Sequence, residues 1–182
     1  PSVNRPQISQ FYEDYVIFQI RAFDDHGAHA RLLAEARTMV AQVLRADVDL
    51  RSEQEVVDAL SVQVSYGSDD LTLVDWVAAI VFDAAADDTR AVLEFATVQL
   101  LELRHLDHQL DTALESYYDA LTHSPKGPFS LFTKADDKLR EIGQLQVESA
   151  VLFENINNAL KLLGDQYLER LYQQAAKRYH LK

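Results

Sequence analysis

The stretch that decides the fold is residues 91–121, which read AVLEFATVQLLELRHLDHQLDTALESYYDAL. Large apolar side chains recur in it at spacings of three and four residues, as on one face of an α-helix. These side chains are Leu103, Leu106, Leu110, Leu114, Tyr117 and Leu121. Asp87 and Asp88 precede the stretch and suit the positive end of a helix dipole. The pattern therefore predicts one helix of roughly 45–50 Å.

A second helical pattern follows after a strong interruption. Residues 123–128 read HSPKGP, and two prolines with a glycine cannot continue a helix. A capping-box pattern begins at Thr133, and near-heptad apolar spacing runs from there toward the end of the chain. Gly164 lies inside this pattern, where it either kinks the helix or permits close packing. The sequence predicts an antiparallel, coiled-coil-like helical hairpin with its turn at residues 123–132.

The first 85 residues have a different pattern, in which short strands alternate with helices. Strand segments are rich in β-branched and aromatic residues, and the helical segments have apolar residues every three or four positions. The predicted elements are a strand over 15–20, a helix over 28–44, a helix from the capping box Ser52–Glu55 to Leu60, and a β-hairpin with strands 62–66 and 71–82.

The predicted fold class is α+β and predominantly helical. Residues 1–85 form a small α+β subdomain, an antiparallel sheet with helices on one face. Residues 86–182 form the long helical hairpin. This division follows from the change of pattern, from short mixed elements to two long amphipathic helices.

Composition excludes several classes of function. The chain is acidic, with a net charge of −12 over 182 residues, so its surface repels nucleic-acid phosphates. It has no cysteine, which excludes disulfides, thiolate nucleophiles and cysteine-ligated zinc. No apolar run reaches the roughly 18–20 residues that span a bilayer, and no signal peptide is visible. No phosphate-binding, dinucleotide-binding or nucleophile-elbow motif is present, so we predict no catalytic or cofactor-binding residues.

The densest ionisable cluster lies within residues 102–111. Glu102, His105 and His108 are three residues apart in turn, and neighbours at that spacing on a helix can chelate a divalent metal. Di-iron bundles need further glutamates and a second Glu-x-x-His pair, which the chain lacks. The favoured interpretation is a solvated helix face, and a metal-dependent enzyme that uses this cluster is the alternative. His26 and His29 form a second pair, which we interpret as solvation and capping.

Several segments carry a resemblance to a known family. They are LEFATVQLLELR at 93–104, NALKLLGDQY at 158–167 and LERLYQQAAKRYHL at 168–181, with Ser65-Tyr66 and Asp75-Trp76. Together they resemble an uncharacterised bacterial membrane-protein family, distantly YagE-like and of unknown function. The resemblance implies a helical hairpin followed by another helix and then by a hydrophobic membrane segment. It implies no substrate, cofactor or catalytic residue.

These observations lead to a first functional hypothesis. The chain begins at Pro1 rather than Met, so we expect a piece of a longer protein at the cytoplasmic face of a membrane, anchored by a segment absent from this sequence. The resemblance and a mildly basic C-terminal end suit that position. The predicted role is non-enzymatic, through helix-mediated assembly or partner binding, with a homo-oligomer or a protein partner at the hairpin. A sensor domain with a small ligand between sheet and hairpin is a third possibility.

Overall fold

The structure is a computed structural model of the chain. It describes residues 12–22, 28–50, 52–122 and 165–181, together with the helical positions 140, 143, 144, 147, 150, 151 and 154. The chain divides into two compact units. The sheet unit comprises residues 1–100 and 164–182, and the helical unit comprises residues 101–163. The division predicted from sequence, residues 1–85 and 86–182, stays a prediction.

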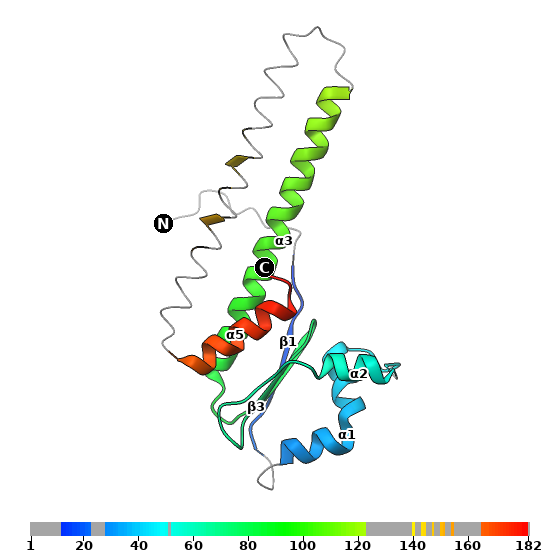
Figure 1. The fold of residues 1–182 in the computed structure, drawn as a ribbon, viewed down its shortest axis with the longest axis vertical. Coiled ribbons are helices and arrows are strands. Elements are labelled where there is room, and N and C mark those ends of the chain that lie inside the picture. Colours follow the sequence, from blue (N-terminus) through cyan, green and yellow to red (C-terminus); the bar gives the residue numbers. More distant parts are fainter. Residues whose placement is uncertain are drawn as a thin grey trace. The chain divides into compact units, whose positions relative to one another are not determined.

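A four-stranded sheet organises the sheet unit (Figure 1). Its strands lie in the order β1-β4-β3-β2, with both β1 and β2 at edges. The strands are β1 (Val16–Ile20), β2 (Gln63–Val64), β3 (Leu71–Val74) and β4 (Ala78–Phe82). β2, β3 and β4 pair antiparallel, whereas β1 pairs parallel to β4. The sheet is therefore mixed, whereas the sequence predicted an antiparallel one. β4, the parallel neighbour of β1, follows β1 only after two helices and two other strands.

The segment 71–82 corrects one prediction. It was expected to be one strand, but the structure divides it into β3 and β4, joined by a turn at residues 75–77. The N–H of Asp75 donates to the carbonyl of Ala78 over 2.9 Å, which closes this turn. All nine residues of the two strands are buried. Strands that are covered on both faces have no alternation of apolar and polar residues. The sequence pattern therefore does not show where one strand ends and the next begins.

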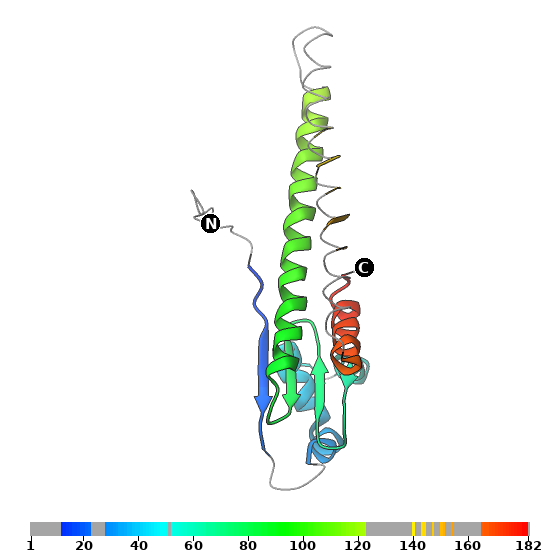
Figure 2. The same ribbon diagram turned by 90° about the vertical axis from the view of Figure 1, so that its left-hand side faces the viewer.

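Helices cover both faces of the sheet, whereas the sequence predicted them on one face. On one face α1 (Ala28–Arg45) and α2 (Glu53–Ala59) share an apolar core with alternate residues of β3 and β4, among them Leu73 and Ile80. Thr72 points to the other face, where its hydroxyl lies 3.3 Å from that of Tyr167 in α5 (Gln166–Arg178). α3 (Asp87–Thr122) packs on α5, and the hydroxyl of Tyr172 donates to Gln99 Oε1. Figure 2 shows the four strands side by side, in the order β1-β4-β3-β2.

The helices of the N-terminal part begin close to the predicted positions. α1 has a kink at Ala36, where φ is −126° and ψ is 25°. α2 has Ser52 as its N-cap residue, as the capping box predicted, but the Ser52 side chain makes no capping hydrogen bond. Glu55 bonds instead to Arg45, over 2.8 Å. The Glu55 carboxylate therefore forms a tertiary ion pair in place of the hydrogen bond that the capping box predicted.

The first helix of the predicted hairpin is confirmed as α3, which has Asp87 and Asp88 in its first turn. The predicted turn at residues 123–132 and the start at Thr133 lie outside the described residues. The prediction of a helix that continues beyond Gly164 is wrong, because α5 begins separately. Asp165 is an extended N-cap, and its carboxylate accepts hydrogen bonds from the N–H groups of Tyr167 and Leu168. The α+β fold class is confirmed, and assembly through the hairpin stays a prediction.

Candidate functional site

Asp75 lies at the centre of a charged cluster in the sheet unit. It follows β3 directly, and its side chain is fully buried. Its Oδ2 accepts a hydrogen bond from Nε of Arg45 over 2.5 Å, and its Oδ1 accepts one from Nε of Arg178 over 2.7 Å. A buried carboxylate is very costly unless it is paired and hydrogen-bonded. The two guanidinium groups therefore explain how this side chain is tolerated inside an apolar sheet.

The two arginines come from elements that are far apart in the sequence. Arg45 ends α1 and Arg178 ends α5, which lie on opposite faces of the sheet. The guanidinium of Arg178 also lies over the ring of Trp76, 5.4 Å from its centroid, in a cation–π arrangement. One carboxylate thus joins the ends of two helices to the turn between β3 and β4.

α2 supplies the outer carboxylates of the cluster. Asp58 lies 2.5 Å from Arg45 and 2.7 Å from Arg178, and Glu55 lies 2.8 Å from Arg45. We call these four residues, together with Asp75, the Asp75 network. It contains two cations and three anions, and each guanidinium bridges two or more carboxylates. Charges that are paired in this way stabilise the packing of α1, α2 and α5 and leave no strong nucleophile or base.

The ionisation of the Asp75 network follows from these contacts. Hydrogen bonds from Arg178 hold the pKa of Asp58 below its ordinary value of 3.8, against the smaller effect of burial. Burial lowers the pKa of each arginine, but hydrogen bonds to Asp75 and Asp58 outweigh it, so both pKa values are raised. The charged forms of these three groups are therefore the stable ones in the folded protein.

This shift predicts a dependence of stability on pH. Because the pKa of Asp58 is lower in the folded than in the unfolded chain, its contribution is present above about pH 4. That contribution is lost as the pH falls through the folded pKa. We expect Asp58→Asn to flatten the loss of unfolding free energy between pH 5 and pH 2, measured by urea denaturation at each pH. An unchanged slope in Asp58→Asn would contradict this assignment, and Asp69→Asn, at an exposed turn, is the control.

Two tyrosines lie beside the network, of which Tyr15 is half-buried and Tyr179 is buried. The rings of Tyr15 and Tyr179 meet edge to face with centroids 5.5 Å apart, and the Tyr15 hydroxyl donates to the Asp75 carbonyl over 3.2 Å. Burial raises the pKa of both hydroxyls, that of Tyr179 to about 12. Both phenols are therefore protonated at neutral pH; Tyr15 serves as a hydrogen-bond donor, and Tyr179 packs against its ring.

No sequence pattern predicted the Asp75 network. The two residues of each hydrogen-bonded pair in the network are separated by 10 to more than 100 positions in the sequence. No local spacing therefore connects them. One signal was present, because Asp75 is the only charged residue in the apolar run 71–82. A lone carboxylate in a buried run needs a partner, and that requirement points to Arg45 and Arg178 only once the fold is known.

The predicted metal candidates occupy one helix of the helical unit. Glu102 and His108 are exposed, and His105 is partly buried on α3. Within the part of the chain that the structure describes, no group of three histidine or acidic side chains is arranged to hold a metal ion. The structure thus adds no further ligand to the spacing seen in the sequence. His26 lies outside the described residues, and His29 lies against Phe82 with ring centroids 6.1 Å apart.

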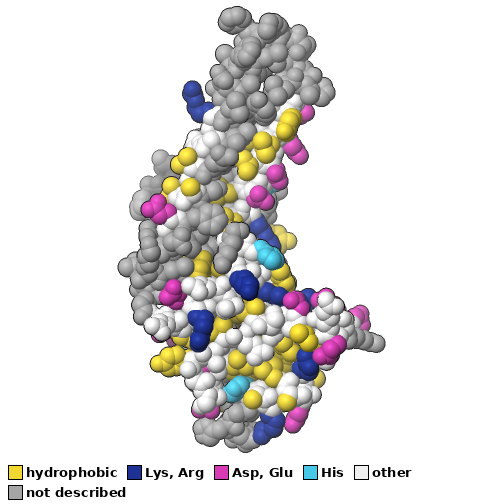
Figure 3. Space-filling model, in the orientation of Figure 1, with side chains coloured by type: hydrophobic (Ala, Val, Ile, Leu, Met, Phe, Trp, Pro, Cys, Tyr) yellow, Lys and Arg dark blue, Asp and Glu magenta, His cyan; other side chains and the backbone are white. Residues whose placement is uncertain are grey.

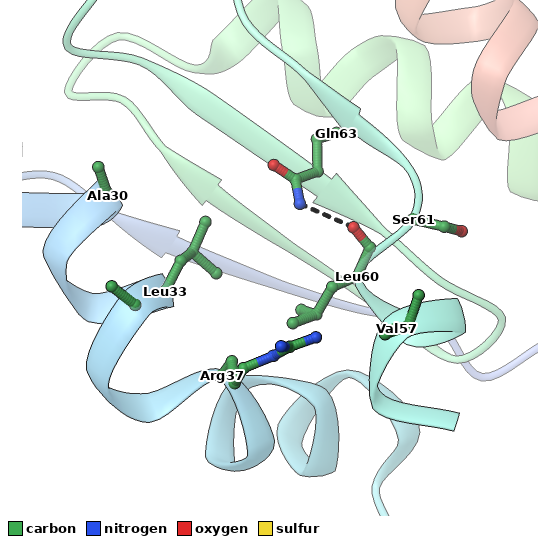
Figure 4. Close-up of a pocket in the computed structure, with 8 residues that line it drawn as sticks. Ala30, Leu33, Arg37, Val57, Leu60, Ser61 and Gln63 are labelled. Carbon is green, nitrogen blue, oxygen red and sulfur yellow. Dashed lines mark hydrogen bonds between the residues drawn. The ribbon is translucent and has the colours of Figure 1, made fainter. Parts of the chain in front are cut away.

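An open groove lies between α1, α2 and the start of β2. It encloses about 620 Å³ and is lined mainly by apolar side chains. Figure 4 shows Leu33 and Leu60 directed into it, with Val57 on the α2 side and Arg37 reaching across from α1. Its lining residues are Ala30, Leu33, Ala34, Arg37, Val57, Leu60, Ser61 and Gln63. Hydrophobic side chains gather on this part of the surface (Figure 3).

The polar groups of the groove are already paired with one another. Arg37 lies 3.0 Å from Glu53, and the Gln63 amide donates to the Leu60 carbonyl over 2.8 Å. A groove with paired polar groups and an apolar floor is suited to binding an apolar surface. It has no arrangement of acid, base and nucleophile that would define a reaction.

The fold and the site define an α+β domain with an internal ion-pair network and an open apolar groove. Residues 1–89 match the family described as "Uncharacterized protein MJ0711, N-terminal domain". The chain is also similar to "Uncharacterized protein MJ0711" of Methanocaldococcus jannaschii, at 24% identity over 174 residues, which is 94% of this chain and 52% of that protein. The chain thus spans about half the length of this curated relative. No solved structure matches the chain.

These comparisons correct the resemblance drawn from the sequence. The identification with a YagE-like bacterial membrane-protein family is wrong, because both matches are to an MJ0711-type family. The short segments behind the resemblance are mostly leucine-rich sequence with helical spacing, a pattern that unrelated proteins share. The expected membrane anchor loses its main support with it. In the described parts of the chain, no helix is both long and apolar enough to cross a membrane.

Proposed function

We propose that the sheet unit is a protein-interaction domain that binds an amphipathic helix of a partner in the groove between α1 and α2. The observation that carries the proposal is the open apolar groove of about 620 Å³. Pockets for small molecules enclose most of their ligand. An open groove with an apolar floor fits a helix that lays one face into it.

The shape of the groove supports a helical occupant. Ala30 and Ala34 are one turn apart on α1, and both are exposed. Small side chains at that spacing let another backbone approach closely. Leu33 and Leu60 on the floor, with half-exposed Val57 on the wall, provide contacts for apolar side chains at i, i+3 and i+4.

The rim suggests the chemistry of the partner. Glu53, in the first turn of α2, has a mostly exposed side chain although it pairs with Arg37 of the groove. The whole chain carries a net charge of −12. We therefore infer a helix with a basic polar face, because opposite charge at the rim speeds association and sets orientation.

A peptide selection tests this proposal with the full chain. A displayed library of helical 16-residue peptides is selected for binding, and affinities are measured by fluorescence anisotropy. We expect selected peptides to share apolar residues at i, i+3, i+4 and i+7, with Lys or Arg on the other face. Ala34→Arg and Val57→Glu should each weaken binding by about tenfold or more, since burial of one aliphatic side chain contributes about 1.5–3 kcal/mol.

The matched control is Val48→Glu, an equally drastic change at an exposed valine outside the groove lining. It should leave peptide affinity unchanged. Selected peptides that lack the apolar repeat would argue against the proposal. So would binding that tolerates Ala34→Arg and Val57→Glu while both variants keep the wild-type melting temperature.

A further inference from the structure

The outer side of β1 is an exposed sheet edge. β1 lies at one end of the strand order and pairs with β4 on its inner side (Figure 2). Among the residues that the structure describes, no strand pairs with its outer side. An exposed edge presents a row of unpaired backbone donors and acceptors, which is a template for another strand.

The ladder with β4 defines which backbone groups point outward. The N–H of Val16 donates to Val77 over 3.1 Å, and the carbonyl of Ile20 accepts from Asp83 over 3.2 Å. In a parallel ladder, every second residue of a strand directs both its N–H and its C=O group to the same neighbouring strand. The backbone groups of Val16, Phe18 and Ile20 therefore point to β4. The N–H and C=O groups of Ile17 and Gln19 therefore point away from β4.

The side chains of β1 leave this edge unprotected. Val16 is 49% exposed and Phe18 is 42% exposed, on the face of the sheet that carries α1. The strand sequence VIFQI contains no proline and no charged residue. Residues of these two kinds usually protect an edge strand from pairing. Association at this edge would cover both apolar side chains.

We propose that β1 pairs antiparallel with β1 of a second copy of this chain, about a twofold axis at Ile17, to form one continuous sheet. Parity supports this register, because residues that face each other across a strand pair must point to the same face. Ile17 then lies opposite Ile17, with two exchanged backbone hydrogen bonds, and Val16 lies opposite Phe18. The exposed apolar side chains of one copy thereby cover those of the other.

Charge at the two ends of the strand favours a second copy over an unrelated strand. Glu13 precedes the strand and Arg21 follows it, and both share the face of Ile17 by alternation. In the proposed register Glu13 of each copy lies opposite Arg21 of the other. Opposite charges in facing positions stabilise a strand pair, and a twofold pair makes this contact twice.

The expected dimer is weak and dependent on salt. One strand pair buries less area than a standard interface, so the dissociation constant should lie roughly in the micromolar range. Each copy carries a net charge of −12, and this repulsion is screened as salt is added. Sedimentation equilibrium of the full chain at 10–500 µM should therefore detect a monomer–dimer equilibrium at 300 mM NaCl.

Substitution of Ile17 tests the location. Ile17→Pro removes an outward N–H and leaves the ladder with β4 intact, so it should weaken dimerisation at least tenfold without unfolding the sheet unit. Ile17→Val is the matched control and should dimerise as the wild type does. Dimerisation that tolerates Ile17→Pro would place the interface elsewhere, and a strictly monomeric chain would show that another segment covers this edge. Both results overturn the proposal.

A disulfide tests the register, since the chain has no other cysteine. Facing Cα atoms in a hydrogen-bonded pair lie about 5.5 Å apart, within the range of disulfides. Under mild oxidation Ile17→Cys should form covalent dimers at least tenfold faster than Phe18→Cys, whose facing residue is Val16. Equal rates, or a faster Phe18→Cys reaction, overturn the register.

A charge exchange gives a further test that does not depend on Ile17. Arg21→Glu alone places Glu opposite Glu and should weaken the dimer several-fold, as should Glu13→Arg. The double variant restores opposite charges at both contacts and should restore dimerisation. Absence of rescue would overturn the pairing of these ends.

The groove between α1 and α2 lies on other elements, so failure here leaves the peptide-binding proposal standing, and the reverse also holds.

Discussion

Replacement of Asp75 by asparagine should lower the free energy of unfolding by about 3–5 kcal/mol, the usual cost of removing one partner from a buried ion pair. The side chain of Asp75 is fully buried, and those of Arg45 and Arg178 are only 19% and 10% exposed. Without the central carboxylate, two poorly hydrated guanidinium groups face each other with only the outer carboxylates of α2 for compensation. Repulsion between them adds to the loss.

Urea denaturation followed by circular dichroism measures this effect. For a chain of this size each kcal/mol corresponds to roughly 2–4 °C in melting temperature, so the loss should be visible by heating as well. Glu35→Gln is the control, since it removes one acidic charge at an exposed position of α1. It should change the unfolding free energy by less than about 0.5 kcal/mol. An Asp75→Asn protein as stable as this control would show that the Asp75 network contributes little.

Truncation of Leu171 to alanine should destabilise the sheet unit by about 2–5 kcal/mol, as large-to-small changes in a core do. Leu171 is fully buried in α5 beside Tyr172, Ala175 and Ala176. α5 contacts β2 and β3, so the cavity would open between the helix and the sheet. A loss of this size would show that α5 is a necessary part of this unit.

Hydrogen exchange locates the effect of this change. Leu171→Ala should raise amide exchange in β3 and β4 as well as in α5. Lys177→Ala is the matched control, because Lys177 is exposed on the same helix. Faster exchange confined to α5, with the strands unchanged, would mean that this helix does not stabilise the sheet.

The elements that the sequence predicted well are those whose pattern is local. The strand at β1 follows from consecutive β-branched and aromatic residues, and α3 follows from a long repeat of apolar residues behind Asp87 and Asp88. The α+β class follows from the change between these two patterns. In each case the side chains that determine the element are its own.

Three features could not be predicted, because each depends on residues from distant elements. The run 71–82 contains a turn that is stabilised by the partners of Asp75 rather than by glycine or proline. α5 begins at an Asp165 cap although the apolar repeat continues across Gly164. Helices cover both faces of the sheet. The apolar run 71–82 does not predict this, because two short strands buried on both faces and one longer strand give the same run of apolar residues.

By itself, then, the sequence determined the strand β1, the helices α1 to α3 and the α+β class, because the spacing of apolar residues within a few turns specifies these elements. Only the tertiary structure decided where β3 ends, that α5 belongs to the sheet unit, and that Arg45 and Arg178 meet at Asp75. Burial makes an isolated charge costly, so the position of Asp75 is settled by partners 30 and 103 residues away.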